Sequence, residues 1–546
     1  MCILGCMKLS SQNIDNLGLV AGMCDEIGIS AMIDQACGNQ AKNKNLSFGQ
    51  CVKCMILNGL GFVGRTLYLY SEYFEDKPID HFLGIPIKPE QIDDNVLGRT
   101  LDKLFSLGVT GLFTQIALKA MKVLDIKVKS LHLDSTSFHV DGNYSSLLEQ
   151  GESRIELVQG YSRDHRPDLN QIVLQMITSN QGNIPLFMQA ASGNSSDKTS
   201  FAEIVAKHAK SFKDAVENRH LVGDSALYTP ASIQQLDKDS CLFVTRVPSR
   251  IQSVSESIRK CNRNEMVKLN DGYSAQEHAS TYADIRQRWV IYFSQAAYER
   301  ESKTLAKNYL KGSESELKAF IKLSKEVFGC PQDALKYYKR ETSKYKYLEI
   351  NEMEIIEVQK HPTVGRPKKG NKAVTIGYQV RGYAACSLRV KQVAESEKGF
   401  FVLSTNDMDP SFSVQDILKT YKSQQSVERG FRFLKSPDFL VSAIFLKKPE
   451  RIEALLMVMT LCLLVYASIE HKVREKLCDN EETFLDQKKR PTQNPTARWV
   501  FFCFLGLHVI YVDGKKREVT NLKSRHHIIL RCLGPPYQRM YYSELW

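Results

Sequence analysis

The strongest constraint on the fold of this chain is a change of hydrophobic period near residue 126. Before it, segments such as "CVKCMILNGLGFVGRTLYLY" space their apolar residues by three and four, which predicts helices. After it, "VKSLHLDSTSFHV" alternates as a strand does, and "QIVLQMITSNQGNIPLFMQAAS" indicates two strands joined by an Asn-Gln-Gly-Asn turn. A helical first region is therefore followed by a region that forms a sheet.

Strands and helices then alternate along the chain. The pattern predicts a helix near Lys198–Ser211, the strand "HLVGD", a helix around Thr229–Leu236 and the strand "CLFVTRV". It breaks off in a charged stretch and resumes at the strand "GFFVLSTND", which leads into an amphipathic helix and a very apolar helix, Ile452–Tyr466. Strands followed by helical crossovers are typical of an α/β fold with a mixed sheet.

Five regions follow from these patterns. We expect a helical N-terminal domain at 1–125, the first part of an α/β core at 126–247, an inserted subdomain at 248–397, the second part of the core at 398–470 and a basic C-terminal region at 471–546.

Positive charge gathers near the C-terminus. The formal net charge is +12, and the stretch from Gln487 onward holds 11 basic against three acidic residues, whereas residues 1–126 hold 11 basic against 13 acidic ones. A basic region on a near-neutral body suggests contact with a polyanion, although solubility alone also tolerates it.

The sequence favours a cytoplasmic protein without a membrane partner. The 14 cysteines lie mostly in apolar runs, as reduced cysteines do. The most apolar run, Ala454–Ala467, is shorter than the roughly 20 residues that span a bilayer.

Two aspartates follow apolar strands and are candidates for a binding site. Asp134 follows "SLHL" and Asp224 follows "HLVG", so each is expected where a strand hands over to a loop. Ligands of open α/β sheets gather at the carboxyl ends of strands. Either aspartate alone would serve equally well as a helix cap or a turn former.

Glu428 is the third candidate, in the stretch "YKSQQSVERGFRFLK". If this stretch is one helix, about 100° per residue brings four polar side chains within about 60° of one another: Tyr421, Gln424, Glu428 and Lys435. The adjoining face is apolar and would pack on the sheet, formed by Val427, Phe431 and Leu434, while Lys422 and Arg429 would point to solvent. Glu428 is thus placed to share a site with the aspartates. A solvated salt bridge with its basic neighbours is the alternative.

The spacing Y-x2-Q-x3-E-x6-K resembles the signature Y-x2-R-x3-E-x6-K of bacterial insertion-sequence transposases, which are cut-and-paste DDE enzymes with an RNase H-like core and an insertion before the catalytic Glu. The blocks "LHLDSTSFHV", "GYSRDHRPDLNQ", "LVGDSALY" and "GFFVLSTND" are also similar to this family, and the resemblance runs from about Lys129 to Ser468. The departure is Gln424, because a neutral amide cannot hold a phosphate by charge.

The resemblance implies a metal-dependent DNA transposase. Asp134, Asp224 and Glu428 would be catalytic and would bind two Mg²⁺ ions, with Mn²⁺ as a substitute. The substrate would be double-stranded DNA, cut at the terminal inverted repeats of the element and joined to target DNA by phosphodiester hydrolysis and transesterification. The N-terminal domain would bind the element ends, and a homodimer would hold both ends in a synaptic complex, in the cytoplasm and on the nucleoid.

Further DNA contacts are implied at the edge of the site, by Tyr421, Gln424, Arg429, Arg432 and Lys435. Trp289 would stack on a flipped base if it is not a core residue. Arg366, in "GRPKKG", would enter a narrow minor groove if this stretch is not simply a basic loop.

In "SRDHRPDL", Asp164, Arg166 and Asp168 either lie near the site or stabilise a polar loop by pairing. Two alternative functions stay open. One is an RNase H-like nuclease that only cleaves, and the other is a decayed copy that binds DNA without catalysis, which Gln424 favours.

Overall fold

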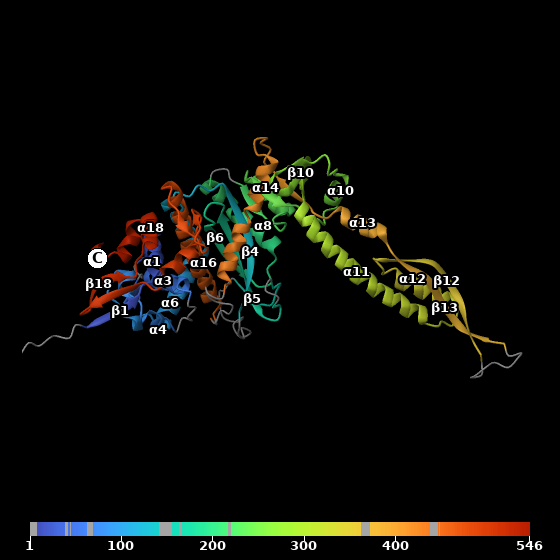
Figure 1. The fold of residues 1–546 in the computed structure, drawn as a ribbon, viewed down its shortest axis with the longest axis horizontal. Coiled ribbons are helices and arrows are strands. Elements are labelled where there is room, and N and C mark those ends of the chain that lie inside the picture. Colours follow the sequence, from blue (N-terminus) through green and yellow to red (C-terminus); the bar gives the residue numbers. More distant parts are fainter. Residues whose placement is uncertain are drawn as a thin grey trace, which may run out of the picture.

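A nine-stranded mixed sheet forms the centre of the protein in the computed structural model (Figure 1). The structure describes residues 8–38, 42–43, 45–62, 69–140, 155–162, 166–216, 220–361, 372–436, 446 and 448–545. The strand order is β6-β5-β4-β7-β8-β14-β11-β10-β9. Its first five strands are β4 (Ser130–Val140), β5 (Asn170–Ser179), β6 (Pro185–Ser192), β7 (His220–Gly223) and β8 (Phe243–Arg246).

The first five strands have the topology of an RNase H-like core. β5 runs antiparallel to both β4 and β6, whereas β4, β7 and β8 are parallel to one another. Helices α8 (Asp197–Val216) and α9 (Pro230–Lys238) make the crossovers, as parallel strands require. The order 3-2-1-4-5 with only the second strand reversed confirms the predicted fold class.

The segment 248–397 is not one separate insertion, which corrects the expectation from the sequence. β9 (Val267–Lys268), β10 (Tyr273–Tyr282) and β11 (Ile285–Ser294) continue the main sheet, because β11 pairs with β14 (Phe400–Thr405). The charged composition of the segment favoured a separate insertion. The strand "RWVIYFS", however, carries apolar residues on both faces and is buried on both, as a strand inside a sheet is.

Only the later part of that segment projects from the body. α11 (Gln295–Lys325) runs outward to α12 (Pro331–Thr342), the hairpin of β12 (Leu348–Lys360) and β13 (Val374–Cys386), and α13 (Leu388–Ser396) (Figure 1). We call residues 295–397 the arm. It has a small core of its own, formed by Phe320, Leu323, Ala334 and Val380.

A long apolar helix, α16 (Pro449–Asp479), lies in the half of the molecule away from the arm (Figure 1). Its most apolar window has a mean hydropathy of 2.2, enough for a membrane span, but 83% of that window is buried inside the protein. α16 is therefore the core helix around which the N-terminal helices pack, and it extends beyond the predicted Ile452–Tyr466. Those helices are α1 (Leu17–Ile27), α2 (Ile29–Cys37), α3 (Phe48–Leu60), α4 (Tyr70–Phe74), α5 (Ile79–Leu83), α6 (Asp94–Leu107) and α7 (Val109–Val123).

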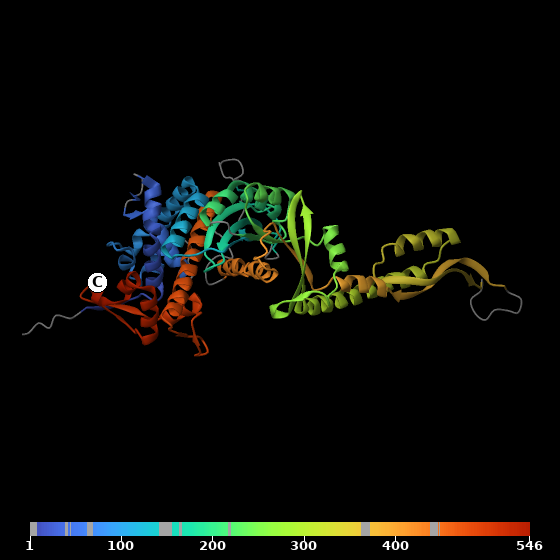
Figure 2. The same ribbon diagram turned by 90° about the horizontal axis from the view of Figure 1, so that it is seen from above.

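The basic C-terminal region packs on the N-terminal helices and does not stand apart (Figure 2). β1 (Leu9–Asn13) pairs with β17 (His508–Val512), which forms a hairpin with β18 (Lys515–Thr520). The hydroxyl of Tyr537 donates to the carboxylate of Glu26, which also pairs with Lys472. The remaining helices here are α17 (Ala497–Phe504), α18 (Ser524–Leu533) and α19 (Pro535–Tyr541).

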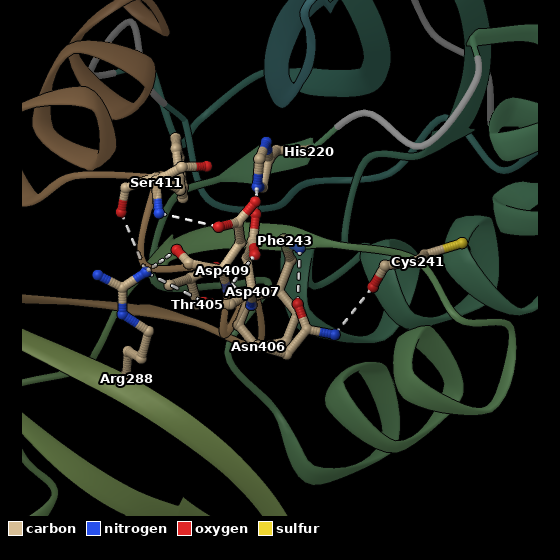
Figure 3. Close-up of polar contacts among 10 residues, drawn as sticks. His220, Cys241, Phe243, Arg288, Thr405, Asn406, Asp407, Asp409 and Ser411 are labelled. Atoms are coloured by element: carbon tan, nitrogen blue, oxygen red, sulfur yellow. Dashed lines mark hydrogen bonds and ion pairs between the residues drawn. The ribbon is translucent and has the colours of Figure 1, made fainter.

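The loop 406–413 connects β14 to the helices that carry Tyr421 and Glu428, and side chains from three strands hold it (Figure 3). Asn406 is bonded to the backbone of Cys241 and Phe243 beside β8, each at 3.0 Å. The carboxylate of Asp407 lies 2.8 Å from Nε2 of His220 at the start of β7.

Arg288, on β11, binds the backbone of this loop. Its Nη1 donates to the backbone carbonyl oxygens of Asp407, Asp409 and Phe412 at 3.3, 3.1 and 3.0 Å. Glu277 on β10 holds the other side of the guanidinium at 2.6 and 3.0 Å. Hydrogen bonding to Glu277 raises the pKa of Arg288, so its charge is permanent. The loop therefore gives the following helices a fixed starting point.

A glycine exchange tests the packing of the two termini. A Cβ atom at Gly22 in α1 would lie 2.7 Å from the buried ring of Tyr537, whereas one at Gly111 in α7 would meet nothing within 4 Å. Overpacking costs about 1–3 kcal/mol, which outweighs the roughly 1 kcal/mol that alanine gains over glycine in a helix. In urea unfolding, Gly22→Ala should lower stability and Gly111→Ala should raise it slightly. Equal free energies of unfolding for the two variants would contradict the packing of Tyr537 against Gly22.

Removing Arg288 tests the anchoring of the loop. Hydrogen bonds to a charged group contribute about 1.5–3 kcal/mol, so Arg288→Ala should speed amide hydrogen exchange in 406–413 by roughly tenfold or more. Arg340, on the arm, is the control, because its exposed pair with Glu341 contributes little. Unchanged exchange of the loop in Arg288→Ala, measured by mass spectrometry, would show that the loop is held by other contacts.

Candidate active site

Three neighbouring parallel strands bring two carboxylates and one guanidinium into a row. In the register of the sheet, Leu133 of β4 lies beside Gly223 of β7, which lies beside Thr245 of β8. The next residue along each chain is Asp134, Asp224 or Arg246. Residues that are aligned in neighbouring strands face the same side of a sheet, so these three share one side.

Asp134 lies within a strand and not at its end, which corrects the expectation. β4 continues to Val140 because it pairs with β5 along its whole length, whereas β7 stops at Gly223. Asp224 directly follows β7, as predicted, and its Oδ1 accepts a hydrogen bond from the backbone N–H of Ala226 at 2.9 Å. The sheet therefore opens at the end of β7, beside the middle of β4.

The stretch Tyr421–Lys435 is not the single helix that the periodicity predicted. α14 (Val414–Lys422) ends before Ser423, and α15 (Gln425–Leu434) begins two residues later. Ser423 keeps helical backbone angles, but its hydroxyl donates to the carbonyl oxygen of Thr420 at 2.6 Å and lies 3.1 Å from Nε2 of His132 on β4. The competition of a serine side chain with helical hydrogen bonds explains the interruption.

The predicted apolar and polar faces are both present despite the break between α14 and α15. The apolar face of Val427, Phe431 and Leu434 is buried, as expected. The four polar side chains of the other face line one cavity of about 740 Å³, which they share with Asp134 and Asp224: Tyr421, Gln424, Glu428 and Lys435. Lys422 also lines this cavity, with its Nζ 4.3 Å from the centre of the Tyr273 ring, and so does not point away from the site as predicted.

The cavity carries charges of both signs. Its acidic lining residues are Asp134, Asp224, Glu301 and Glu428, and its basic ones are Arg246, Arg300, Arg432, Lys422 and Lys435. Arg300 and Glu301 come from the start of α11, so the root of the arm closes one side. Such a mixture suits a ligand that combines phosphate groups with bound cations.

The donor atoms of the cavity fit a hard divalent cation. Carboxylate oxygens are the ligands that Mg²⁺ and Mn²⁺ prefer, and the predicted trio of Asp134, Asp224 and Glu428 is among the four carboxylates of this cavity. Within the described ranges, no three side chains of His, Cys, Asp or Glu already lie close enough to hold one ion together. The trio therefore has the right chemistry, but it is not a closed, single-ion site.

Two neutral groups lie beside the carboxylates. Burial raises the pKa of Tyr421, and the charges of Asp224 and Glu428 raise it further, while Arg246 opposes them. The phenol is thus protonated at neutral pH and able to donate a hydrogen bond. Burial lowers the pKa of His132 to about 4, so its imidazole is uncharged where it meets Ser423.

The other predicted contact residues divide into two groups. Arg432 lines the cavity, whereas Arg429 is exposed and is not among its lining residues. Trp289 is 1% exposed, and its Nε1 donates to the hydroxyl of Tyr228 at 3.1 Å. The interpretation of Trp289 as a base-stacking residue is therefore wrong for this structure, because both faces of β11 are covered.

Arg366 and Asp164 lie outside the described residues. Arg166 and Asp168 form an exposed ion pair, which agrees with the loop-stabilising alternative. The sequence analysis missed Arg246, although its position one residue past the strand core of "CLFVTRV" was a signal for it.

Comparison with known proteins gives two family matches. Residues 131–291 match the family described as "Transposase DDE domain", which covers the strands that carry Asp134 and Asp224. Residues 9–118 match a family described as a domain of unknown function (DUF4277). No curated protein matches.

Among solved structures, the chain is similar to the piggyBac transposase in a cryo-EM synaptic complex with hairpin DNA. The alignment has a TM-score of 0.38 and 9% identity, and it covers 91% of this chain and 82% of that chain. This likeness is too low to support an argument, so the core is assigned from its own strand order. The strand order and the family match agree, so residues 131–291 form a transposase DDE domain within an RNase H-like core.

Proposed function

We propose that this DNA transposase serves an insertion sequence, cutting at the terminal inverted repeats of its element and joining the freed ends to target DNA. One observation carries the proposal. Asp134 and Asp224 from adjacent strands and Glu428 from a distant helix line a single cavity together with several cations. A structural role for Glu428 as half of a surface salt bridge would not require it to face the two aspartates.

The three carboxylates are proposed to hold two divalent cations, Mg²⁺ or Mn²⁺. When bound, such ions would lower the pKa of an attacking water or 3′-hydroxyl and stabilise charge on the leaving oxygen. The protein's own part is to orient the phosphodiester. Tyr421 offers a neutral hydrogen-bond donor and Lys435 a positive charge from the same wall, whereas Gln424 offers only an amide donor.

Double-stranded DNA is the proposed partner. We propose that two copies of the protein pair, because two element ends must be held together. The basic C-terminal region and the N-terminal helices form one packed unit, so they are proposed to bind the element end jointly. Arg429 is proposed to contact flanking phosphates and Arg366 to enter a narrow minor groove, with the whole reaction on nucleoid DNA in the cytoplasm.

Removing any of the three carboxylates should abolish the chemistry. Asp134→Asn, Asp224→Asn and Glu428→Gln should each lower cleavage of a plasmid that carries the element's ends by about a hundredfold or more, because each takes away a charged ligand. Binding of an end duplex should persist. Glu341→Gln, at an exposed position on the arm, is the matched control and should cut normally. Normal cutting by Glu428→Gln would refute the proposed site.

Joining distinguishes the transposase from the two alternatives. Given a duplex with an exposed 3′-hydroxyl at the element end, target plasmid and Mg²⁺, the protein should form covalently joined products, and excess EDTA should stop the reaction. A nuclease would cut the DNA and leave no joined product. A decayed copy would bind the end duplex and neither cut nor join it.

A further inference from the structure

Arg246 is the basic residue that the sheet places in one row with Asp134 and Asp224. It ends β8, and the register of the three parallel strands places it beside Asp224, which in turn lies beside Asp134. The hydroxyl of Thr245 donates to the backbone carbonyl oxygen of Asp224 at 2.8 Å, which ties the two strand ends together. Because both neighbours are fixed by the sheet, the position of Arg246 relative to the carboxylates is set by backbone hydrogen bonds.

The guanidinium of Arg246 rests on a rigid aromatic surface. Its central carbon lies 5.7 Å from the centre of the Phe401 ring, which is stacked on Tyr292 at 5.3 Å. Tyr292 is buried, and its hydroxyl donates to the carbonyl oxygen of Val414 at 2.8 Å. An arginine on an aromatic face keeps its planar fork free for other ligands. Arg246 is itself exposed and lines the cavity.

The facing helices bring Lys422, Arg432 and Lys435 to the cavity, but the residue between Tyr421 and Glu428 on this lining is neutral. Gln424 is 9% exposed and neutral, and it lies between Tyr421 and Glu428 along the lining of the cavity. Arg246 lines the same cavity from the sheet, and its charge opposes the raised pKa of Tyr421, which neighbours Gln424 there. Arg246 thus adds a guanidinium from the sheet to the cavity that Gln424 lines with a neutral amide.

We propose that Arg246 binds the reacting phosphate of the DNA strand and provides the guanidinium that Gln424 lacks. This rests on the proposed function, because it assumes that the cavity receives a phosphodiester. A guanidinium can donate to two phosphate oxygens at once and so fixes both the position and the orientation of the group. Asp134 and Asp224 would hold the cations, and Arg246, beside Asp224 in the same row, would bind the remaining charge of the phosphate.

A charge-neutral phosphate tests this contact without any catalysis. Two duplexes of the inverted repeat flanking the coding region are compared, one normal and one with a methylphosphonate at the cleavage position, in metal-free buffer with EDTA. We expect the methylphosphonate to weaken binding of the wild-type protein about tenfold. In Arg246→Gln the two duplexes should bind within about twofold of each other, because the partner of that charge is gone. Thermal unfolding checks that the variant is folded.

Two further variants sharpen the test. Arg263→Gln is the matched control, since Arg263 also lies over an aromatic ring, 4.3 Å from Phe293, but is not among the residues that line the cavity. It should keep the tenfold difference. The exchange Arg246→Gln with Gln424→Arg should restore both the difference and Mg²⁺-dependent cleavage, because the guanidinium then comes from the other wall.

The outcomes separate this inference from the proposed function. If Arg246→Gln keeps the tenfold sensitivity, or if the wild-type protein shows none, the phosphate contact is refuted, even where cleavage by the wild type and its loss in Glu428→Gln uphold the transposase. If Glu428→Gln cuts like the wild type, the proposed active site fails, whatever the binding of the two duplexes shows.

Discussion

The in-register parallel pairing of β4, β7 and β8 is the constraint on which the site depends. It aligns Leu133, Gly223 and Thr245, and so the polar residues that follow them must emerge side by side. The carboxylates of Asp134 and Asp224 repel each other, and the backbone hydrogen bonds of the sheet keep them side by side. A bound cation would balance the charge of these carboxylates. The register of the strands and the binding of divalent ions are therefore linked.

The opposite wall of the cavity comes from helices that are fixed at both ends. Arg288 and Asn406 hold the loop before α14, and Ser423 meets His132 where α14 gives way to α15. Glu428 lies more than 200 residues after both aspartates in the chain, and it reaches them because three strands and a helix break determine its path. The arm adds Arg300 and Glu301 at its root, so any movement of the arm would alter the entrance of the cavity.

Much of the fold could be predicted from the sequence, because alternation and helical spacing report directly on burial. The hairpin β5–β6, the strand β7 and the buried face of Val427, Phe431 and Leu434 follow from such patterns. The rest depended on long-range pairing that has no local signal. Nothing near Trp289 shows that β14 covers its strand, and nothing in the C-terminal region shows that it joins the N-terminal helices. The position of Arg246 at the end of "CLFVTRV" was a local signal, but its place beside Asp224 follows only from the pairing of β7 with β8.

The most direct test of the account is whether one divalent ion site touches all three acidic segments. Fe²⁺ bound in place of Mg²⁺, with ascorbate and peroxide, generates hydroxyl radicals that cut the backbone near the bound ion. The account predicts that the protein is cut near Asp134, Asp224 and Glu428 together, and that excess Mg²⁺ suppresses all three cuts in parallel. Cuts near only one of these residues, or cuts that Mg²⁺ leaves unchanged, would contradict it.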